Sequence, residues 1–196
     1  MKKVLLIALA LITCLAAEAQ LRTIKPSSIE RISDEDFDEE LDWQSLTTNF
    51  HVEKVVASST LKAQGSKNYK VDNLFDIDPK TAWVEGVKGH GIGQWIQVKK
   101  ASYYLDGYWC GIGEISILNG YVKSDKAWRE NGRVKRLKVY CNGKPKYIME
   151  LQNSRSLQTF KVDISKGATI RFEILDVYPG TKYQDTAISE IDFNVG

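Results

Sequence analysis

The sequence has 196 residues, of which 43% are hydrophobic and 27% charged, and its net charge is +2. Basic residues are scattered among acidic ones, and this pattern argues against nucleic-acid binding. Beyond the N-terminus no stretch is apolar for long enough to span a bilayer, and the length suits one domain with its own core.

The first residues have the pattern of a secretory signal peptide. Two Lys precede a short apolar run, which ends in the Ala-Glu-Ala site at 17–19. We therefore expect residues 1–19 to be removed before Gln20 and the protein to be exported, whether periplasmic, cell-surface or secreted. Lipid attachment at Cys14 ranks second, because Thr13 stands where such sites usually carry Gly, Ala or Ser.

The next segment is acidic. Residues 20–50 carry eight Asp or Glu against three Lys or Arg, a net charge of −5, concentrated at 34–42. Residues 51–196 carry 22 basic and 16 acidic residues, a net charge of +6. Such a segment is typical of a solvated linker. It could also fold back on the basic domain or bind a partner, and a short docked helix would use Phe37, Leu41 and Trp43.

From residue 51 onward, short alternations of apolar and polar residues are separated by turn signals. In 134–141, for example, Leu137 and Val139 alternate with polar residues at the period of two that a half-buried strand requires. Asn142-Gly143 predicts a two-residue hairpin turn after that strand. The pattern predicts an all-β fold, a single jelly-roll β-sandwich of about eight strands. The candidate strands are 52–58, 94–99, 113–122, 134–141, 146–151, 157–163, 169–176 and 187–194.

Common catalytic and cofactor motifs are absent. Gly89, Gly91 and Gly93 superficially resemble a dinucleotide fingerprint, but a predicted strand follows them where that fingerprint needs a helix. His51 and His90 are the only histidines, and no second ligand stands at zinc spacing from either. No Ser or Cys is placed by a motif beside His90, and no carboxylate pair stands out for glycoside hydrolysis. The sequence therefore disfavours an enzyme.

Two cysteines remain after the predicted cleavage, Cys110 and Cys141. Export would permit a disulfide between them. Two buried free thiols are the alternative, and the sequence does not decide between the two.

Four separated segments resemble one family in the right order: 73–98, 115–144, 154–162 and 170–191. They are similar to the discoidin-like, galactose-binding-like domains, also called coagulation-factor type C domains. More narrowly, they resemble the glycan-binding domain of bacterial NAD glycohydrolases. The resemblance implies an eight-stranded jelly roll, a ligand site on loops at one end, and a non-catalytic role. It does not cover the acidic segment.

The turn "DIDPKTAW" suggests a calcium site. Asp76, Asp78 and Thr81 bring hard oxygen ligands together in one turn, as calcium prefers. The resemblance implies a structural calcium ion at this turn, helped by Glu190 near the C-terminus. Alternatively, Asp76 and Thr81 only cap the turn through hydrogen bonds to the backbone.

Aromatic and polar residues in three groups of loops form the predicted ligand site. Trp83 and Trp95 bracket a Gly-rich loop, and one of the two is expected in the core. Saccharide binding needs an exposed aromatic face and polar groups for the hydroxyls. Gly86 and the glycines after it would let the loop approach a ligand closely. The candidate ligand residues are Trp83, Glu85, Lys88, His90, Asn119, Tyr121, Trp128, Tyr178, Lys182, Tyr183 and Asp185.

These observations predict an exported, non-catalytic module that binds a glycan or glycoconjugate. A protein–protein adhesion or assembly module on the same fold, with a cell-surface protein as partner, is the alternative. An enzyme acting on a cell-wall glycan ranks third.

Overall fold

The computed structural model describes residues 21–31 and 50–195. The predicted signal peptide, Cys14 and the acidic run 34–42 with Phe37, Leu41 and Trp43 lie outside these residues. In the described part, no helix is long and apolar enough to cross a membrane. The helices are a 3-10 helix, η1 (Val71–Phe75), and α3 (Asp125–Glu130). The strands are β1 (Arg22–Ile24), β2 (Ser28–Glu30), β3 (Phe50–His51), β4 (Lys54–Ala57), β5 (Trp83–Val84), β6 (Trp95–Leu105), β7 (Tyr108–Cys110), β8 (Ile112–Asn119), β9 (Gly132–Cys141), β10 (Lys144–Glu150), β11 (Leu157–Ile164), β12 (Ala168–Tyr178) and β13 (Thr186–Asn194).

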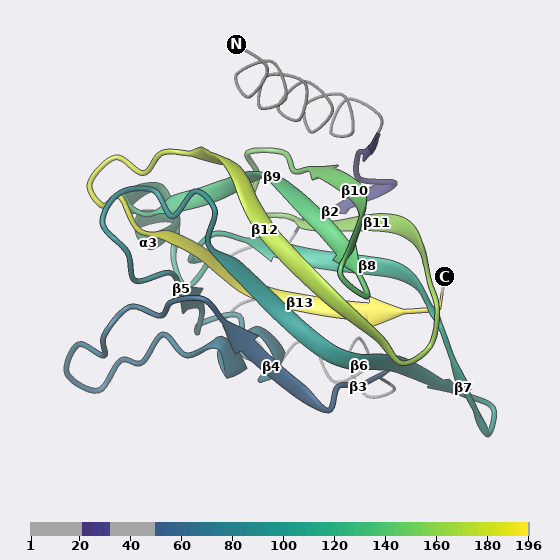
Figure 1. The fold of residues 1–196 in the computed structure, drawn as a ribbon. Helices are drawn as coiled ribbons and strands as arrows, with labels where there is room; N and C mark the ends of the chain where they lie inside the picture. The colour runs from purple at the N-terminus through teal and green to yellow at the C-terminus, as the bar shows by residue number, and fades with distance from the viewer. Residues whose placement is uncertain (1–20, 32–49, 196) are drawn as a thin grey trace, which may run out of the picture.

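The strands form a β-sandwich of two layers (Figure 1). One layer contains β4, β6, β12, β9 and β10, and the other contains β13, β8 and β11. The layers join where β13 runs parallel to β9, at Thr186 and Ala187. This junction lies beside the loops of one end of the sandwich, and it fixes where those loops start.

The core lies between the layers and is built by alternation. In β9, the side chains of Leu137 and Val139 point inward and are fully buried. Arg136, which precedes Leu137, points outward and is exposed. Opposite them, β8 and β13 contribute fully buried residues such as Ile115, Ile117 and Phe193. Each of the eight predicted strands overlaps an observed strand, although β6 continues to Leu105 where 99 was the predicted end, so the prediction of an all-β sandwich is confirmed.

The predicted hairpin turn is also confirmed. Asn142 and Gly143 have φ values of 50° and 78°, and they connect β9 to β10. Positive φ at both positions is the type I′ geometry, which matches the twist of the two strands. The Asn142 side chain accepts a hydrogen bond from the Thr169 backbone N–H at 2.9 Å, so it also holds the neighbouring β11–β12 turn.

The N-terminal boundary of the fold differs from the expectation. The sequence analysis placed all of 20–50 in an acidic segment or linker, but β1 pairs in parallel with β10, and β2 pairs antiparallel with β11. The side chain of Ile24 enters the main core. Strands of three residues have too little alternation to be recognised, and here the pairing partners decide the conformation.

Both cysteines are free in the structure. Cys110 lies in β7 and pairs with Tyr103, whereas Cys141 lies at the end of β9 and packs against the main core. Burial raises the pKa of the Cys141 thiol. Of the two alternatives the sequence left open, the structure has the free thiols.

The docked N-terminal strand gives a stability test. Ile24 is 7% exposed and Ile29, five residues later, is 42% exposed. Ile24→Ala should lower the free energy of unfolding by about 2–5 kcal/mol, because it leaves a cavity in the core. Ile29→Ala should change it by less than about 0.5 kcal/mol. Urea denaturation of both variants measures the free energy of unfolding. Equally small effects of the two substitutions would mean that residues 22–30 are a linker and not part of the fold.

Candidate functional site

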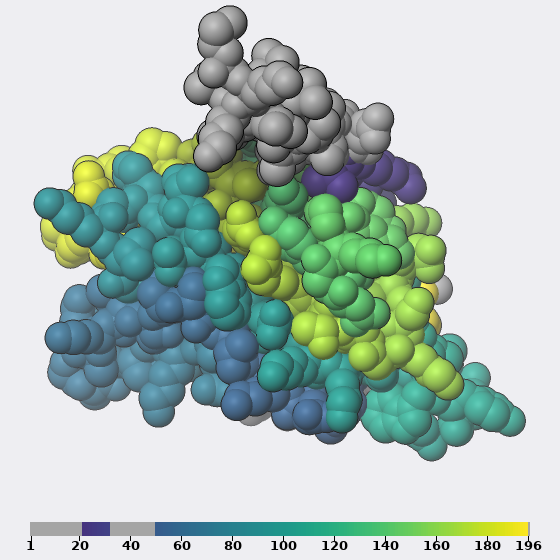
Figure 2. Space-filling model, in the orientation of Figure 1, coloured from purple at the N-terminus to yellow at the C-terminus, as the bar shows by residue number. Residues whose placement is uncertain are grey.

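Four loops meet at one end of the sandwich, at the left in Figure 1. They are the β4–η1 loop (58–70), the β5–β6 loop (85–94), the β8–α3 loop (120–124) and the β12–β13 loop (179–185). Helix α3 lies at the same end. The β6–β7 hairpin projects from the opposite end, where it stands out from the surface (Figure 2).

A cleft of about 180 Å3 lies at this end and is lined by the β4–η1, β8–α3 and β12–β13 loops, by Val84 of β5 and by the end of α3; the β5–β6 loop does not line it. Its lining combines aromatic side chains with carboxylates, amides and one lysine. The lining residues are Leu61, Gln64, Lys67, Tyr69, Val84, Tyr121, Ala127, Glu130, Asn131, Tyr183 and Asp185. Three of the predicted ligand residues, Tyr121, Tyr183 and Asp185, are therefore brought together from two of the three predicted loop groups.

Three tyrosines form the aromatic part of the cleft. The rings of Tyr69 and Tyr121 meet edge to face, with centroids 6.3 Å apart and an interplanar angle of 85°. Tyr69 is nearly buried, while Tyr183 is 41% exposed. Burial raises the pKa of Tyr69 and of Tyr121, so both hydroxyls stay protonated and can donate hydrogen bonds. Tyr183 is thus the exposed ring of the cleft, beside the hydroxyl donors of Tyr69 and Tyr121.

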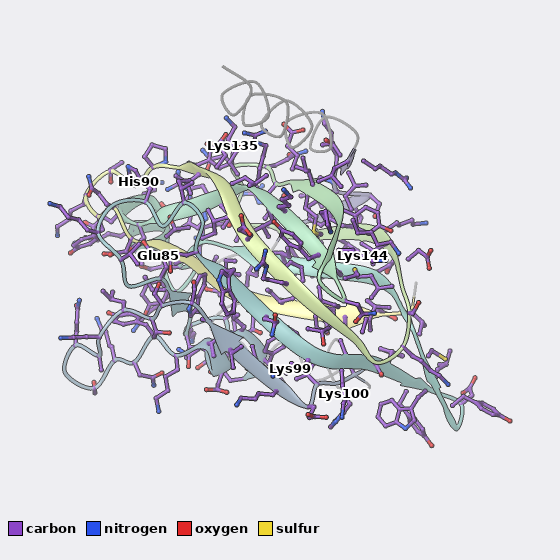
Figure 3. All side chains as sticks on the ribbon, viewed as in Figure 1. Glu85, His90, Lys99, Lys100, Lys135 and Lys144 are labelled. Atoms are coloured by element: carbon purple, nitrogen blue, oxygen red, sulfur yellow. The ribbon has the colours of Figure 1, made fainter. Side chains whose placement is uncertain are left out.

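Glu85 lies beneath the Gly-rich loop rather than in the cleft (Figure 3). It is fully buried, and its carboxylate accepts hydrogen bonds from the backbone N–H groups of Val87 at 2.8 Å and Thr186 at 3.3 Å. Burial raises its pKa, and the hydrogen bonds oppose that shift. A buried carboxylate is tolerated only with such partners, so Glu85 ties the loop to β13. Its prediction as a ligand residue is wrong.

The glycines of this loop serve packing as well as turning. Gly91 has a φ of +68°, and a Cβ on it would lie 2.5 Å from Cγ of Glu85. Gly89 has a φ of +99°, but a Cβ there would meet nothing within 4 Å. The strand β6 follows, as expected, and this again excludes a dinucleotide loop.

Two other predicted ligand residues are structural. Trp83 is fully buried, and its Nε1 donates to the carbonyl of Ser59, so Trp83 is the core tryptophan and Trp95 is half-exposed. Asn119 is buried and uses its amide on both backbone groups of Val134. Both are corrections to the predicted site, since neither side chain can reach a ligand.

The indole ring of Trp128 is largely engaged in contacts within the protein. Its Nε1 donates to the Asn119 carbonyl at 3.0 Å, and the Arg133 guanidinium lies 4.5 Å from the ring centroid. Its ring packs on a small apolar cluster that includes Leu118 and Leu157. Its role is to hold α3 against the sandwich.

The remaining predicted residues lie around the cleft or away from it. Lys88 is exposed on the Gly-rich loop, and His90 is half-buried with Nδ1 3.2 Å from the Gln184 carbonyl oxygen. Lys182 is exposed and forms an ion pair of 4.0 Å with Glu130, a residue of the cleft. Tyr178 lines a different hollow.

Sequence analysis missed eight of the eleven residues that line the cleft. Tyr69, Gln64 and Lys67 precede the first segment of the family resemblance, in a loop without a motif of its own. Glu130 and Asn131 end the short helix α3, whose six residues are too few for a helical period. Only the folded arrangement of three loops and α3 identifies them.

The predicted calcium turn has the geometry of a capped turn. Asp76 accepts hydrogen bonds from the Thr81 hydroxyl at 2.9 Å and the Asp78 backbone N–H at 3.1 Å, while Asp78 accepts one from the Lys80 N–H at 2.8 Å. Glu190 reaches the same place from β13 and is buried, and its Oε1 has no hydrogen-bond partner. Burial and the negative charge of Asp76 raise the pKa of Glu190 to about 9.

Among residues 21–31 and 50–195, no group of three or more His, Cys, Asp or Glu is arranged to hold a metal ion. A cation at the Asp76–Glu190 pair would therefore take most of its ligands from hydroxyl and backbone oxygens. Calcium accepts such ligands, and the unpartnered Glu190 oxygen fits a cation beside it. Without a cation, the Glu190 carboxyl, with its pKa of about 9, would be protonated at neutral pH.

Substitutions in the Gly-rich loop test its support by Glu85. Gly89→Ala should cost about 1–2 kcal/mol of unfolding free energy, because only the backbone conformation is strained. Gly91→Ala has a similar strain and also forces its methyl group into Glu85, which should cost about 1–3 kcal/mol more. Urea denaturation measures both, and equal losses would mean that Glu85 does not pack under Gly91.

Solved structures with this fold include carbohydrate-binding modules. No curated protein matches the sequence. CpGH89CBM32-5 of Clostridium perfringens, in complex with GalNAc-β-1,3-galactose, is 16% identical with a TM-score of 0.52, over 74% of this chain and 95% of that one. The CBM32-1 and CBM32-2 domains of Clostridium perfringens ZmpB, in complex with GalNAc, are 12% identical with a TM-score of 0.55, over 88% of this chain and 40% of that one. A fragment of a putative chitobiase of Bacteroides thetaiotaomicron is 15% identical with a TM-score of 0.54, over 74% and 87%.

These likenesses show the fold that the two layers and their loops already indicated. The family is shown by the sequence itself, since a family model matches residues 46–194. The matched region contains the cleft and all strands from β3 to β13. The chain belongs to the family of NAD glycohydrolase translocation F5/8 type C domains.

Proposed function

We propose that the protein is an exported, non-catalytic module that binds a glycan or glycoconjugate in the cleft at the loop end. The observation that carries the proposal is the convergence of Tyr69, Tyr121 and Tyr183 with the carboxylates of Glu130 and Asp185. A pyranose ring has apolar C–H faces and hydroxyl edges. Aromatic rings bind the faces, and carboxylates and amides bind the hydroxyls.

The character of the cleft indicates shallow, reversible binding. Its volume of about 180 Å3 is below the range of about 300–1,000 Å3 typical of pockets that enclose a whole small molecule. A terminal sugar that leaves most of its chain in solvent fits this size. Two proteins of the same fold are described in complex with GalNAc or a GalNAc-containing disaccharide, and they support the ligand class.

Catalysis on a glycan has less support. Glu85, the carboxylate nearest the Gly-rich loop in sequence, is buried and bonded to backbone N–H groups. Such a group is held for structure, not presented to a glycosidic bond. The signal-like residues 1–19 support export, as the sequence alone suggests.

A protein partner is the second candidate function, and one observation favours it. The β6–β7 hairpin carries four exposed apolar or aromatic side chains: Tyr104, Leu105, Tyr108 and Trp109. The rings of Tyr104 and Trp109 lie with centroids 5.0 Å apart. Exposed groups of this kind mark contact sites in other proteins. An adhesion module would use this hairpin and not the cleft.

A structural calcium ion is part of the same proposal. Asp76 and Glu190 would hold it, together with Thr81 and nearby backbone oxygens, with Asp78 beside them. The ion would balance the two carboxylates and link the η1–β5 turn to β13. It would stabilise the loop end without touching the glycan.

Binding can be tested on a panel of immobilised glycans. Tyr183→Ala and Asp185→Asn should each weaken binding about tenfold, which corresponds to roughly 1.4 kcal/mol. Tyr108→Ala is the matched control, because Tyr108 is 75% exposed at the opposite end and should leave binding unchanged. Isothermal titration with the best glycan gives the affinities.

Two results would contradict the proposal. If no glycan binds above background and a protein partner depends on Tyr108 and Trp109, the module is an adhesion module. Turnover of a saccharide that is lost in Asp185→Asn would instead indicate an enzyme.

Calcium is tested by thermal unfolding. A chelator should lower the melting temperature by about 5–10 °C relative to calcium at a hundredfold excess over its Kd. Asp76→Asn should abolish this difference. Asp72→Asn, an exposed residue of η1, should preserve it. If the chelator leaves the melting temperature of the native protein unchanged, the calcium site is refuted.

A further inference from the structure

A second hollow lies outside the cleft. Its volume is about 320 Å3, and it forms where the β1–β2 connection, the β10–β11 loop and the end of β12 meet. The lining residues are Lys25, Pro26, Glu150, Leu151, Gln152, Asn153 and Tyr178. This volume reaches the lower end of the range of small-molecule pockets, about 300–1,000 Å3.

The hollow and the cleft share no lining residue. In sequence, the start of the β12–β13 loop connects Tyr178 of the hollow to Tyr183 of the cleft, and it is bonded to the end of α3. The N–H of Thr181 donates to the Arg129 carbonyl at 2.9 Å, and the N–H of Tyr183 donates to the Glu130 carbonyl at 2.8 Å. A ligand in one hollow therefore does not occupy the other.

An aromatic wall is held in place on one side of the second hollow. The Tyr178 hydroxyl donates to the Leu151 carbonyl at 3.0 Å, and the Leu151 N–H donates to the Lys135 carbonyl at 2.9 Å. The ammonium of Lys135 lies 5.9 Å from the ring centroid of Tyr178. The ring is thus fixed before any ligand arrives, which lowers the entropic cost of binding.

Amide groups form the next wall. Gln152 and Asn153 are both exposed. The side-chain amide of buried Gln158 holds the backbone of Gln152. It accepts from the Gln152 N–H at 2.7 Å and donates to the Gln152 carbonyl at 3.0 Å. The Asn153 Oδ1 accepts from Arg133 Nε at 3.0 Å, so its NH2 group is left to donate. The loop offers its amides on a rigid backbone.

The charges at the rim cancel. Lys25 and Glu150 form an ion pair of 3.8 Å, and their side chains are exposed to solvent. With one cation and one anion already together, the hollow favours neither an anionic nor a cationic ligand. A neutral, hydroxyl-rich ligand can accept from the amides and from Lys25 and can donate to Glu150.

We propose that this hollow is a second saccharide-binding site, which takes a neutral sugar unit against Tyr178 with Gln152 and Asn153 on its hydroxyls. The ligand class rests on the proposed function, whereas the site is independent of the cleft. Two weak sites on one chain raise the affinity for a surface that carries many glycans, because the second contact is intramolecular. The docked strand β1 is needed for this, since Lys25 and Pro26 follow it directly.

The test is a titration of the isotope-labelled chain 20–196 with galactose, GalNAc and GalNAc-β-1,3-galactose, followed by NMR. Two separate groups of amide signals should shift: one around residues 120–131 and 183–185, the other around 150–153 and 178. Gln152→Ala should weaken binding at the second group about 2- to 10-fold, the effect of losing one or more hydrogen bonds, and leave the first unchanged. Tyr183→Ala should do the reverse.

Three outcomes overturn the inference. If only the first group shifts, the second site fails and the proposed function stands. If neither group shifts, both fail. If glycine shifts the second group as strongly as the sugars do, the hollow takes a small zwitterion through Lys25 and Glu150. Tyr178→Ala, checked for folding by its amide spectrum, must also abolish the second response.

Discussion

The loop end of the sandwich depends on the buried polar groups of β13. Thr186 contacts the Gly-rich loop through two hydrogen bonds. Its N–H donates to the Glu85 carboxylate, and its hydroxyl donates to the His90 carbonyl at 2.9 Å. Ser189 donates to the Gly120 carbonyl and accepts from the Val122 N–H, and Glu190 lies against Asp76. The buried groups of Thr186 and Ser189 find their partners in neighbouring loops, so this strand positions the Gly-rich loop and the β8–α3 loop, and Glu190 adds a contact to the turn at Asp76. Of these segments, the β8–α3 loop lines the cleft.

A buried arginine extends this principle to the second hollow. Arg133 is nearly buried, and its guanidinium donates to the carbonyls of Trp128 and Asn131 and to Oδ1 of Asn153. Asn131 lines the cleft and Asn153 lines the second hollow. A buried charge without these acceptors would be costly. The hydrogen bonds of Arg133 therefore hold α3 and the β10–β11 loop in fixed positions relative to each other. The Arg133 guanidinium thus contacts a lining residue of each hollow.

Strands of seven or more residues could be predicted from sequence, because alternation over that length leaves one buried face. The short strands β1, β2, β3, β5 and β7 could not, since their partners and not their residues decide the pairing. The site was harder still. Trp83 and Tyr183 are both aromatic residues near predicted loops, yet one is core and the other cleft. Glu85 and Asp185 differ in the same way. The family resemblance placed the loops correctly and was silent on which side chains turn inward.

Rigidity on the protein side has a consequence for how such a module attaches. The β12–β13 loop, which lines the cleft and follows Tyr178 of the second hollow, is bonded through its backbone to α3, and the Gly-rich loop is bonded through Glu85 to β13. Little conformational entropy of the protein is lost when a sugar binds. The affinity of one site is then limited by its small contact area. If both proposed sites bind glycan, attachment to a glycan-covered surface comes from the number of contacts, because a fixed spacing between the two sites makes the second contact intramolecular.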